Sequence, residues 1–259
     1  MSVSYLLERI KNCGAPIAVD LGEAILNIPC DEKRNERVKT VIDATASRAA
    51  AFYIDISLFN NTAAEHGFLY DSLRYAKEKG AYIILDFKAL SYSEEVKKCM
   101  EDSAACDAVT ACAYLGVEYI QPLVFAANKF SKSVFLYLNT EDSSGFSAFS
   151  DLIQLLAGQA FGTAKYSNIG VFLKNADDAA KVREKLQNCM IITKASKISS
   201  DIVDCFDDEG NGALAIVSLL KQGKEFDFEN LYVDSRRAAE RNVRAINKTL
   251  FRKSTVIQI

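Results

Sequence analysis

The chain has little tryptophan, histidine or proline. Its 259 residues include no tryptophan, one histidine and 3 prolines. Because no C-x-x-C pair occurs among the 7 cysteines, a Cys/His zinc site is not expected. An odd number of cysteines cannot all pair within one chain. We interpret them as reduced, partly buried thiols that pack as small hydrophobic groups.

The chain also lacks a large excess of positive or negative charge, and it has no long apolar run. The 31 basic and 34 acidic residues give a net charge of −3, with no basic stripe to neutralise nucleic-acid phosphates. No apolar run approaches the roughly 20 residues of a membrane-spanning helix, and the start of the chain is too charged for a signal peptide. We therefore expect a cytoplasmic protein that binds neither nucleic acid nor membrane. The 49% hydrophobic content excludes disorder.

What the chain does contain is eight short apolar runs that alternate with longer helical patterns. Runs of four to seven mostly apolar residues predict strands buried on both faces. Their starts recur every 21 to 36 residues, as in βα units, and eight such units in about 250 residues fit a closed (β/α)₈ barrel. We expect a single TIM-barrel domain over residues 1–259. The predicted strands are 16–21, 52–56, 81–87, 108–111, 134–138, 169–173, 190–193 and 213–218.

Two alternatives to this barrel remain open in the sequence. A doubly wound open sheet is the rival fold, although the first turn lacks the G-x-G-x-x-G of dinucleotide-binding sheets. The eighth run, ALAIVSLLKQG, is equally compatible with a short helix. Asp31 is expected to accept from the first free amides of its helix, and Gly80 to end the next one. The predicted helices are 31–50, 60–79, 91–103, 121–130, 146–163, 176–187 and 234–249.

Polar residues gather where the predicted strands end, which is where function collects in a barrel. Asp20, Asp55 and Asp86 end the first three strands, and Lys88 follows two residues after Asp86. Because strand side chains alternate, Asp86 and Lys88 are predicted to lie side by side in a partly dry cavity. Such a pair suits acid–base chemistry. The alternative is a buried ion pair that only closes the barrel.

Four segments carry a family resemblance: 42–67, 75–95, 106–116 and 134–146. In order and spacing, from about residue 15 to residue 190, they are similar to orotidine 5′-phosphate (OMP) decarboxylase of the longer bacterial branch. DFK at Asp86–Lys88 matches the family's Asp-x-Lys signature, and DAVTACAYLG matches its Asp-Ala-Val-Thr-Val-Asn-Pro-Tyr-Leu-Gly segment. The resemblance implies a TIM barrel, conversion of OMP to UMP in pyrimidine biosynthesis without a cofactor, and a homodimer.

The resemblance also implies roles for individual residues. The family tetrad is a Lys followed by Asp-x-Lys-x-x-Asp, so Asp86 takes the place that stresses the substrate carboxylate and Lys88 the place of the proton donor. Tyr53 stands where the family has its first Lys, and Ser91 where it has its last Asp. One cation and one anion are thus missing together, which keeps the remaining pair neutral.

The expected ligand-holding loops depart from the family as well. The loop after the seventh strand has no glycine, although Lys194 and Ser196 still offer anion donors there. Asn139 and Thr140 are followed by two acidic residues where the family contacts its pyrimidine. The predicted ligand site comprises Asp20, Tyr53, Asp55, Asn139, Thr140, Lys194 and Ser196. Two functions stay open: a decarboxylase with an incomplete tetrad, or a lapsed barrel that binds a nucleotide or sugar phosphate or acts as an interaction protein.

Three further candidates are weaker. His66 is interpreted as a surface-turn residue rather than a catalytic one, and Cys112 as a buried thiol without a neighbouring base. Asp20, Asp55 and Asp86 are oxygen ligands that suit Mg²⁺, but such a site lies outside the family pattern, and no metal is expected.

Overall fold

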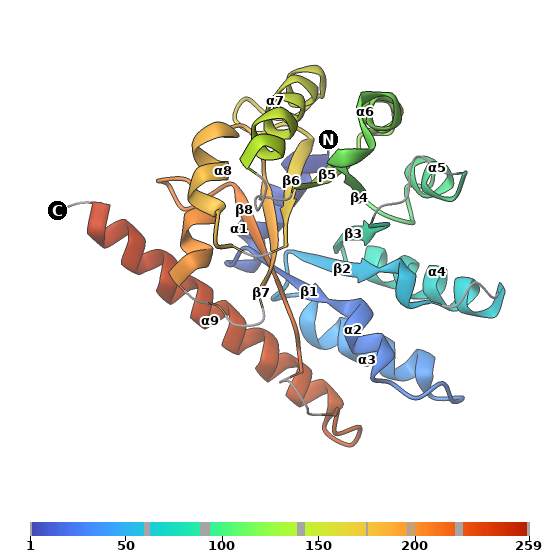
Figure 1. The fold of residues 1–259 in the computed structure, drawn as a ribbon. Coiled ribbons are helices and arrows are strands. Elements are labelled where there is room, and N and C mark those ends of the chain that lie inside the picture. The colour runs from blue at the N-terminus through green and yellow to red at the C-terminus, as the bar shows by residue number, and fades with distance from the viewer. Residues whose placement is uncertain are drawn as a thin grey trace.

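Eight parallel strands form a closed barrel, in which each strand pairs with the next along the chain and β8 pairs with β1 (Figure 1). The computed structural model describes residues 2–59, 63–88, 94–138, 143–174, 176–195, 198, 200–220 and 225–257. The predicted TIM barrel is confirmed, whereas the open sheet and the helix over the eighth run are wrong. The strands are β1 (Ile17–Asp20), β2 (Ala51–Asp55), β3 (Tyr82–Asp86), β4 (Ala108–Cys112), β5 (Ser133–Leu138), β6 (Ile169–Leu173), β7 (Ile191–Ala195) and β8 (Ala213–Val217).

Helices surround the strands, as Figure 1 shows. Within the described residues, no helix combines the length and apolar character needed to cross a membrane. The helices are α1 (Ser2–Cys13), α2 (Leu21–Leu26), α3 (Arg34–Thr45), α4 (Ala63–Glu78), α5 (Glu94–Glu101), α6 (Val117–Phe130), α7 (Ser143–Gln159), α8 (Ala179–Lys185) and α9 (Leu231–Ile257), with short 3₁₀ turns η1 (Ile56–Leu58), η2 (Ala113–Leu115) and η3 (Ser200–Cys205).

Each predicted helix starts three or four residues away from the observed one, and at α3 the contacts of Asp31 show why. Helix α3 begins at Arg34, three residues after Asp31. The Oδ1 atom of Asp31 accepts from the Lys33 amide at 3.0 Å and from the Arg37 guanidinium at 2.9 Å. Asp31 therefore stabilises the turn before the helix instead of capping the helix itself.

The apolar residues form two layers, one inside the barrel and one between the strands and the helices. Ala18, Ile84 and Ile216 belong to the inner layer, and Val19 and Ile83 to the outer one. Because both faces of every strand are covered, the strands are apolar along nearly their whole length. Five of the cysteines are buried, in accord with their expected packing role: Cys13, Cys99, Cys106, Cys189 and Cys205.

Helix α1, which the sequence did not predict, covers the amino-terminal end of the barrel. Val3 and Leu6 join the inner apolar layer. The Ser2 hydroxyl lies 2.7 Å from the hydroxyl of Tyr82, and the Val3 amide donates to Oδ1 of Asn168 at 2.9 Å. With this end covered, the carboxyl ends of the strands are the place to search for a site.

A cluster of charged residues joins the loop before β6 to the loop before β8. Lys165 Nζ lies 2.8 Å from Oδ2 of Asp207 and 2.7 Å from Oε2 of Glu209, and the Tyr166 hydroxyl donates to Asp207. Burial opposes ionisation of Asp207, but the bonds from Lys165 and Tyr166 outweigh it and lower its pKa to about 2. This cluster lies at the end of the barrel opposite the predicted site.

Candidate ligand site at the barrel mouth

The parallel register places the predicted acidic residues at one level of the barrel. Asp20 of β1 is the register partner of Tyr53 on β2, and Asp55 of β2 is the partner of Asp86 on β3. All three carboxylates are buried, with Asp86 only 1% exposed. The carboxyl ends of these strands therefore form one polar surface, which we name the barrel mouth.

Asp86 accepts hydrogen bonds from hydroxyl groups of three different strands. Its Oδ2 atom accepts from the Tyr53 hydroxyl and, at 2.6 Å, from the Tyr137 hydroxyl. Its Oδ1 atom accepts from Thr110 Oγ1 at 2.5 Å and from the Lys88 amide at 2.8 Å. Four donors on one carboxylate satisfy a charge that is otherwise costly to bury.

Both tyrosines of this network remain neutral donors. Burial raises the pKa of Tyr53, and the neighbouring Asp86 charge raises it further. The same two causes raise the pKa of Tyr137. A phenol that keeps its proton donates to Asp86 but adds no positive charge beside it.

The Lys88 ammonium does not pair with the Asp86 carboxylate, so the predicted side-by-side pair of these two charged groups is wrong. The strand ends at Asp86, and Lys88 has a left-handed backbone with φ of 52°, which breaks the alternation of strand side chains. Its ammonium lies 2.8 Å from Oδ2 of Asp55 and donates to Ser57 Oγ at 2.7 Å. The hydrogen bond to Asp55 raises the pKa of Lys88, so it stays charged at neutral pH.

A second lysine enters the mouth from β7. Lys194 Nζ lies 3.3 Å from Oδ2 of Asp20 and 4.6 Å from the centre of the Tyr53 ring. The Oδ1 atom of Asp20 accepts from the Glu23 amide at 2.9 Å, which caps α2. Burial raises the pKa of Asp20, although Lys194 and the Glu23 amide oppose that rise.

Aromatic rings line the mouth around these charges. The Tyr137 ring stacks on Phe172 with centroids 4.3 Å apart, and the Tyr53 ring meets Phe172 edge-on at 5.9 Å. Sequence reasoning missed Tyr137, Phe172 and Thr110 as parts of the site. The alternation of strand side chains could have identified two of them, because Tyr137 and Phe172 both lie on the inward face of their strands and pack with the inner apolar layer.

Several predicted site residues are not placed by the structure. Asn139, Thr140, Ser196 and Ser91 lie outside the described residues. His66 lies in α4, but the structure does not describe its side chain. Cys112 is half-buried at the end of β4.

The structure does not support a magnesium site built from Asp20, Asp55 and Asp86. Asp20 and Asp55 are paired with lysines, and Asp86 is occupied by hydroxyl donors. In the part of the chain that is described, no group of three acidic, cysteine or histidine side chains is arranged to hold a metal ion.

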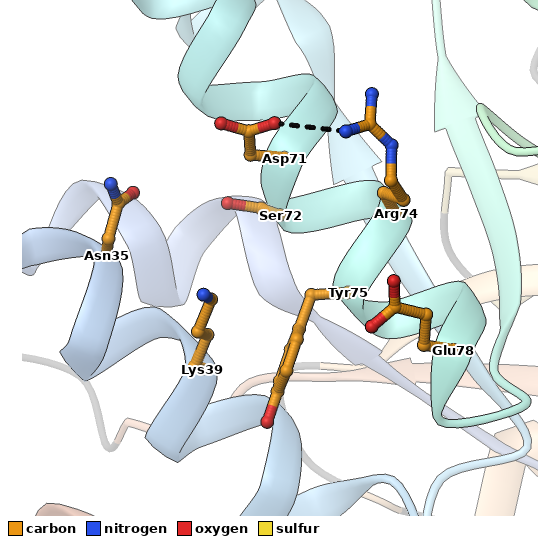
Figure 2. Close-up of a pocket in the computed structure, with 7 residues that line it drawn as sticks. All are labelled: Asn35, Lys39, Asp71, Ser72, Arg74, Tyr75 and Glu78. Carbon is orange, nitrogen blue, oxygen red and sulfur yellow. Dashed lines mark ion pairs between the residues drawn. The ribbon is translucent and has the colours of Figure 1, made fainter.

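A separate pocket of about 210 Å³ lies on the outer helices, between α3 and α4. Figure 2 shows its residues, with the ion pair between Asp71 and Arg74, 3.6 Å apart, at one side. Lys39 and Glu78 also line it, so charges of both signs face the pocket. It belongs to the helical layer and shares no residue with the barrel mouth.

The sequence from residue 17 to residue 217 matches the model of the orotidine 5′-phosphate decarboxylase / HUMPS family. The match runs from the first residue of β1 to the last residue of β8, and so covers the whole barrel. The chain belongs to this family. Its membership is distant: the orotidine 5′-phosphate decarboxylase of Clostridium acetobutylicum is 26% identical over 240 residues, which are 82% of this chain and 84% of that protein. The enzyme of the same name from Clostridium kluyveri is 23% identical, over 88% and 90% of the two chains.

Solved structures of this decarboxylase family share the fold. A putative orotidine-monophosphate-decarboxylase of Toxoplasma gondii aligns with a TM-score of 0.77 at 15% identity, over 98% of both chains. The putative orotidine 5′-phosphate decarboxylase of Streptomyces avermitilis aligns with a TM-score of 0.71 at 20% identity, over 96% of this chain and 95% of that one. At such identities the likeness establishes the barrel alone.

Proposed function

We propose that the barrel mouth binds a nucleotide or a sugar phosphate. We also propose that the chain converts OMP to UMP, but far more slowly than an enzyme with the complete family tetrad. The observation that carries this proposal is the hydroxyl of Tyr53 bonded to Asp86. At this position the family resemblance implies a lysine. A neutral phenol here supplies no cation to the reacting carbon.

The missing charges determine how much slower the decarboxylation is expected to be. Charges arranged before the reaction usually supply the largest part of catalysis, and removal of one such group costs about 10²- to 10³-fold in rate. Asp86 is also enclosed by Tyr53, Tyr137 and Thr110. Hydrogen bonds from these hydroxyls spread its negative charge and so weaken its repulsion of a substrate carboxylate.

The slow decarboxylation in this proposal depends on Lys88. Its ammonium is half-exposed at the mouth, and its pKa is raised, so it holds a proton to give. In this reaction the bond from C6 to the carboxylate carbon breaks, and its electron pair stays on C6 as carbon dioxide leaves. The Lys88 ammonium then gives its proton to C6. The homodimer implied by the resemblance is part of the proposal, and sedimentation of the purified chain tests it.

Two measurements test the proposed function. The first follows UMP formation from OMP by the wild-type chain and by Lys88→Ala, with Lys185→Ala as the matched control because Lys185 pairs with Asp151 on the outer helices at 2.8 Å. We expect slow formation by the wild type and the control, and none by Lys88→Ala. Turnover as fast as that of the clostridial relatives contradicts the proposal.

The second measurement follows thermal unfolding with added UMP. A ligand at 100 times its dissociation constant stabilises the folded state by about 2.7 kcal/mol, which is a visible rise in melting temperature. We expect such a rise with UMP or another phosphorylated sugar. The absence of any rise with all of these compounds rejects a nucleotide or sugar-phosphate site.

A further inference from the structure

Two ammonium groups enter the barrel mouth from opposite sides. Lys88 follows β3 and Lys194 lies on β7, four strands apart in either direction around a closed ring of eight. Lys194 points inward because it shares a strand face with Ile192, which belongs to the inner apolar layer. Of the two lysines, Lys194 is the one that lies over Tyr53, at the position that the family resemblance assigns to a lysine.

The contacts of Lys194 are those of a group that can exchange partners. Its distance of 3.3 Å to Asp20 is long for an ion pair between charged groups, and its side chain is 45% exposed. By contrast, Lys88 has two closer partners in Asp55 and Ser57. A ligand oxygen can therefore take over the Lys194 ammonium without breaking a short bond.

The loss of this partner is tolerable for Asp20. It keeps the hydrogen bond from the Glu23 amide at 2.9 Å. Burial raises the pKa of Asp20, and the hydrogen bond from the Glu23 amide remains to stabilise its carboxylate.

The ring of Tyr53 fixes where the ligand group must lie. Lys194 sits 4.6 Å from the ring centre, while the hydroxyl of the same ring is directed to Asp86. The ring face attracts the cation and so holds the Lys194 ammonium over Tyr53, inside the barrel mouth. This location suits an anionic group carried on the ring of a ligand better than one at the end of a flexible chain.

We propose that Lys194 is a specificity residue that binds an anionic substituent on the ligand ring, such as the carboxylate of OMP, in place of the lysine missing at Tyr53. The inference rests on the proposed function and names the ligand class of that same site: a ring with its own anionic group in addition to a phosphate. Lys194 and Asp55 then supply a cation and an anion to the mouth from positions other than those of the family tetrad.

The test compares OMP with UMP, which lacks the ring carboxylate, by titration calorimetry. We expect Lys194→Met to weaken OMP binding by about 10-fold or more, as loss of a charge-assisted hydrogen bond does, and UMP binding by less than about 2-fold. Lys194→Arg keeps the charge and is expected to retain most of the preference for OMP. The double variant Asp20→Asn/Lys194→Met removes both partners of the pair and separates loss of binding from loss of folding.

Each other outcome overturns the inference in a distinguishable way. Equal weakening of OMP and UMP binding means that Lys194 binds the phosphate or acts only in general attraction. No change in either affinity means that Lys194 serves only as the partner of Asp20. If the folded wild type binds neither nucleotide, the nucleotide part of the proposed function fails first, and the inference fails with it.

Discussion

The hydroxyl of Tyr53 donates to the buried carboxylate of Asp86, so a neutral side chain from β2 is the partner of a charged one from β3. The two residues are 33 positions apart in the chain. Their contact places a phenol, and not a cation, beside the acid at the barrel mouth. It also makes Tyr53 a structural residue of the inner barrel.

Tyr53→Phe is expected to destabilise the fold by about 1–3 kcal/mol, because it removes a donor from a buried carboxylate without changing the size of the ring. Urea denaturation measures this change. Tyr75→Phe is the matched control, since the Tyr75 hydroxyl donates to Asp43 in an exposed position at 2.8 Å. Its expected cost is below about 0.5 kcal/mol, as for most surface substitutions. Equal costs for the two variants contradict a stabilising role of the Tyr53 hydroxyl.

Lys88 has a left-handed backbone, with φ of 52°, that glycine adopts without strain. Lys88→Gly is therefore expected to be more stable than Lys88→Met by about 1 kcal/mol, although both remove the same ammonium. Chemical denaturation of the two variants gives the difference. If Lys88→Met is as stable as Lys88→Gly, the turn after β3 relaxes easily and stores no strain.

Asp207 is expected to make stability depend on pH in acid. Its folded pKa of about 2 is below the ordinary value of 3.8, so its contribution is complete above pH 4 and is lost as the pH falls toward 2. Asp207→Asn lacks this titration. The difference in unfolding free energy between wild type and variant is therefore expected to shrink as the pH is lowered from 5 to 2. If the difference in unfolding free energy stays constant over this pH range, the ion pair between Asp207 and Lys165 is not the source of the difference.

Two glycines are expected to respond to alanine with opposite signs. A Cβ atom at Gly170, on β6, would lie 2.6 Å from ring atoms of Phe135 and 2.7 Å from the Met190 carbonyl oxygen. Gly170→Ala is thus expected to cost about 1–3 kcal/mol through overpacking. A Cβ at Gly158, in α7, meets nothing within 4 Å, and alanine there is expected to stabilise the helix by up to about 1 kcal/mol. Thermal unfolding of both variants checks the two signs.

The barrel itself was predictable because its strands follow a local rule. Each of the eight apolar runs lies where a strand is observed. The boundaries coincide for 169–173 and differ by at most two residues elsewhere, as for the predicted 190–193 and the observed Ile191–Ala195. Both faces of each strand are covered, so burial alone marks these segments. Helix α1 was not predicted, and its apolar side covers the barrel end, a tertiary role that no local pattern reports.

The partners of the charged residues were decided only by the tertiary structure. Sequence spacing placed Asp86 beside Lys88, but the left-handed backbone at Lys88 directs its ammonium to Asp55, and Asp86 instead accepts from Tyr53, Thr110 and Tyr137. These hydroxyls come from β2, β4 and β5, and they reach one carboxylate because the strands close into a barrel. The sequence determined the eight strands and the acids at their ends, because those depend on local burial and alternation. The folded barrel determined which donor meets which acid, because that depends on side chains that converge from distant parts of the chain.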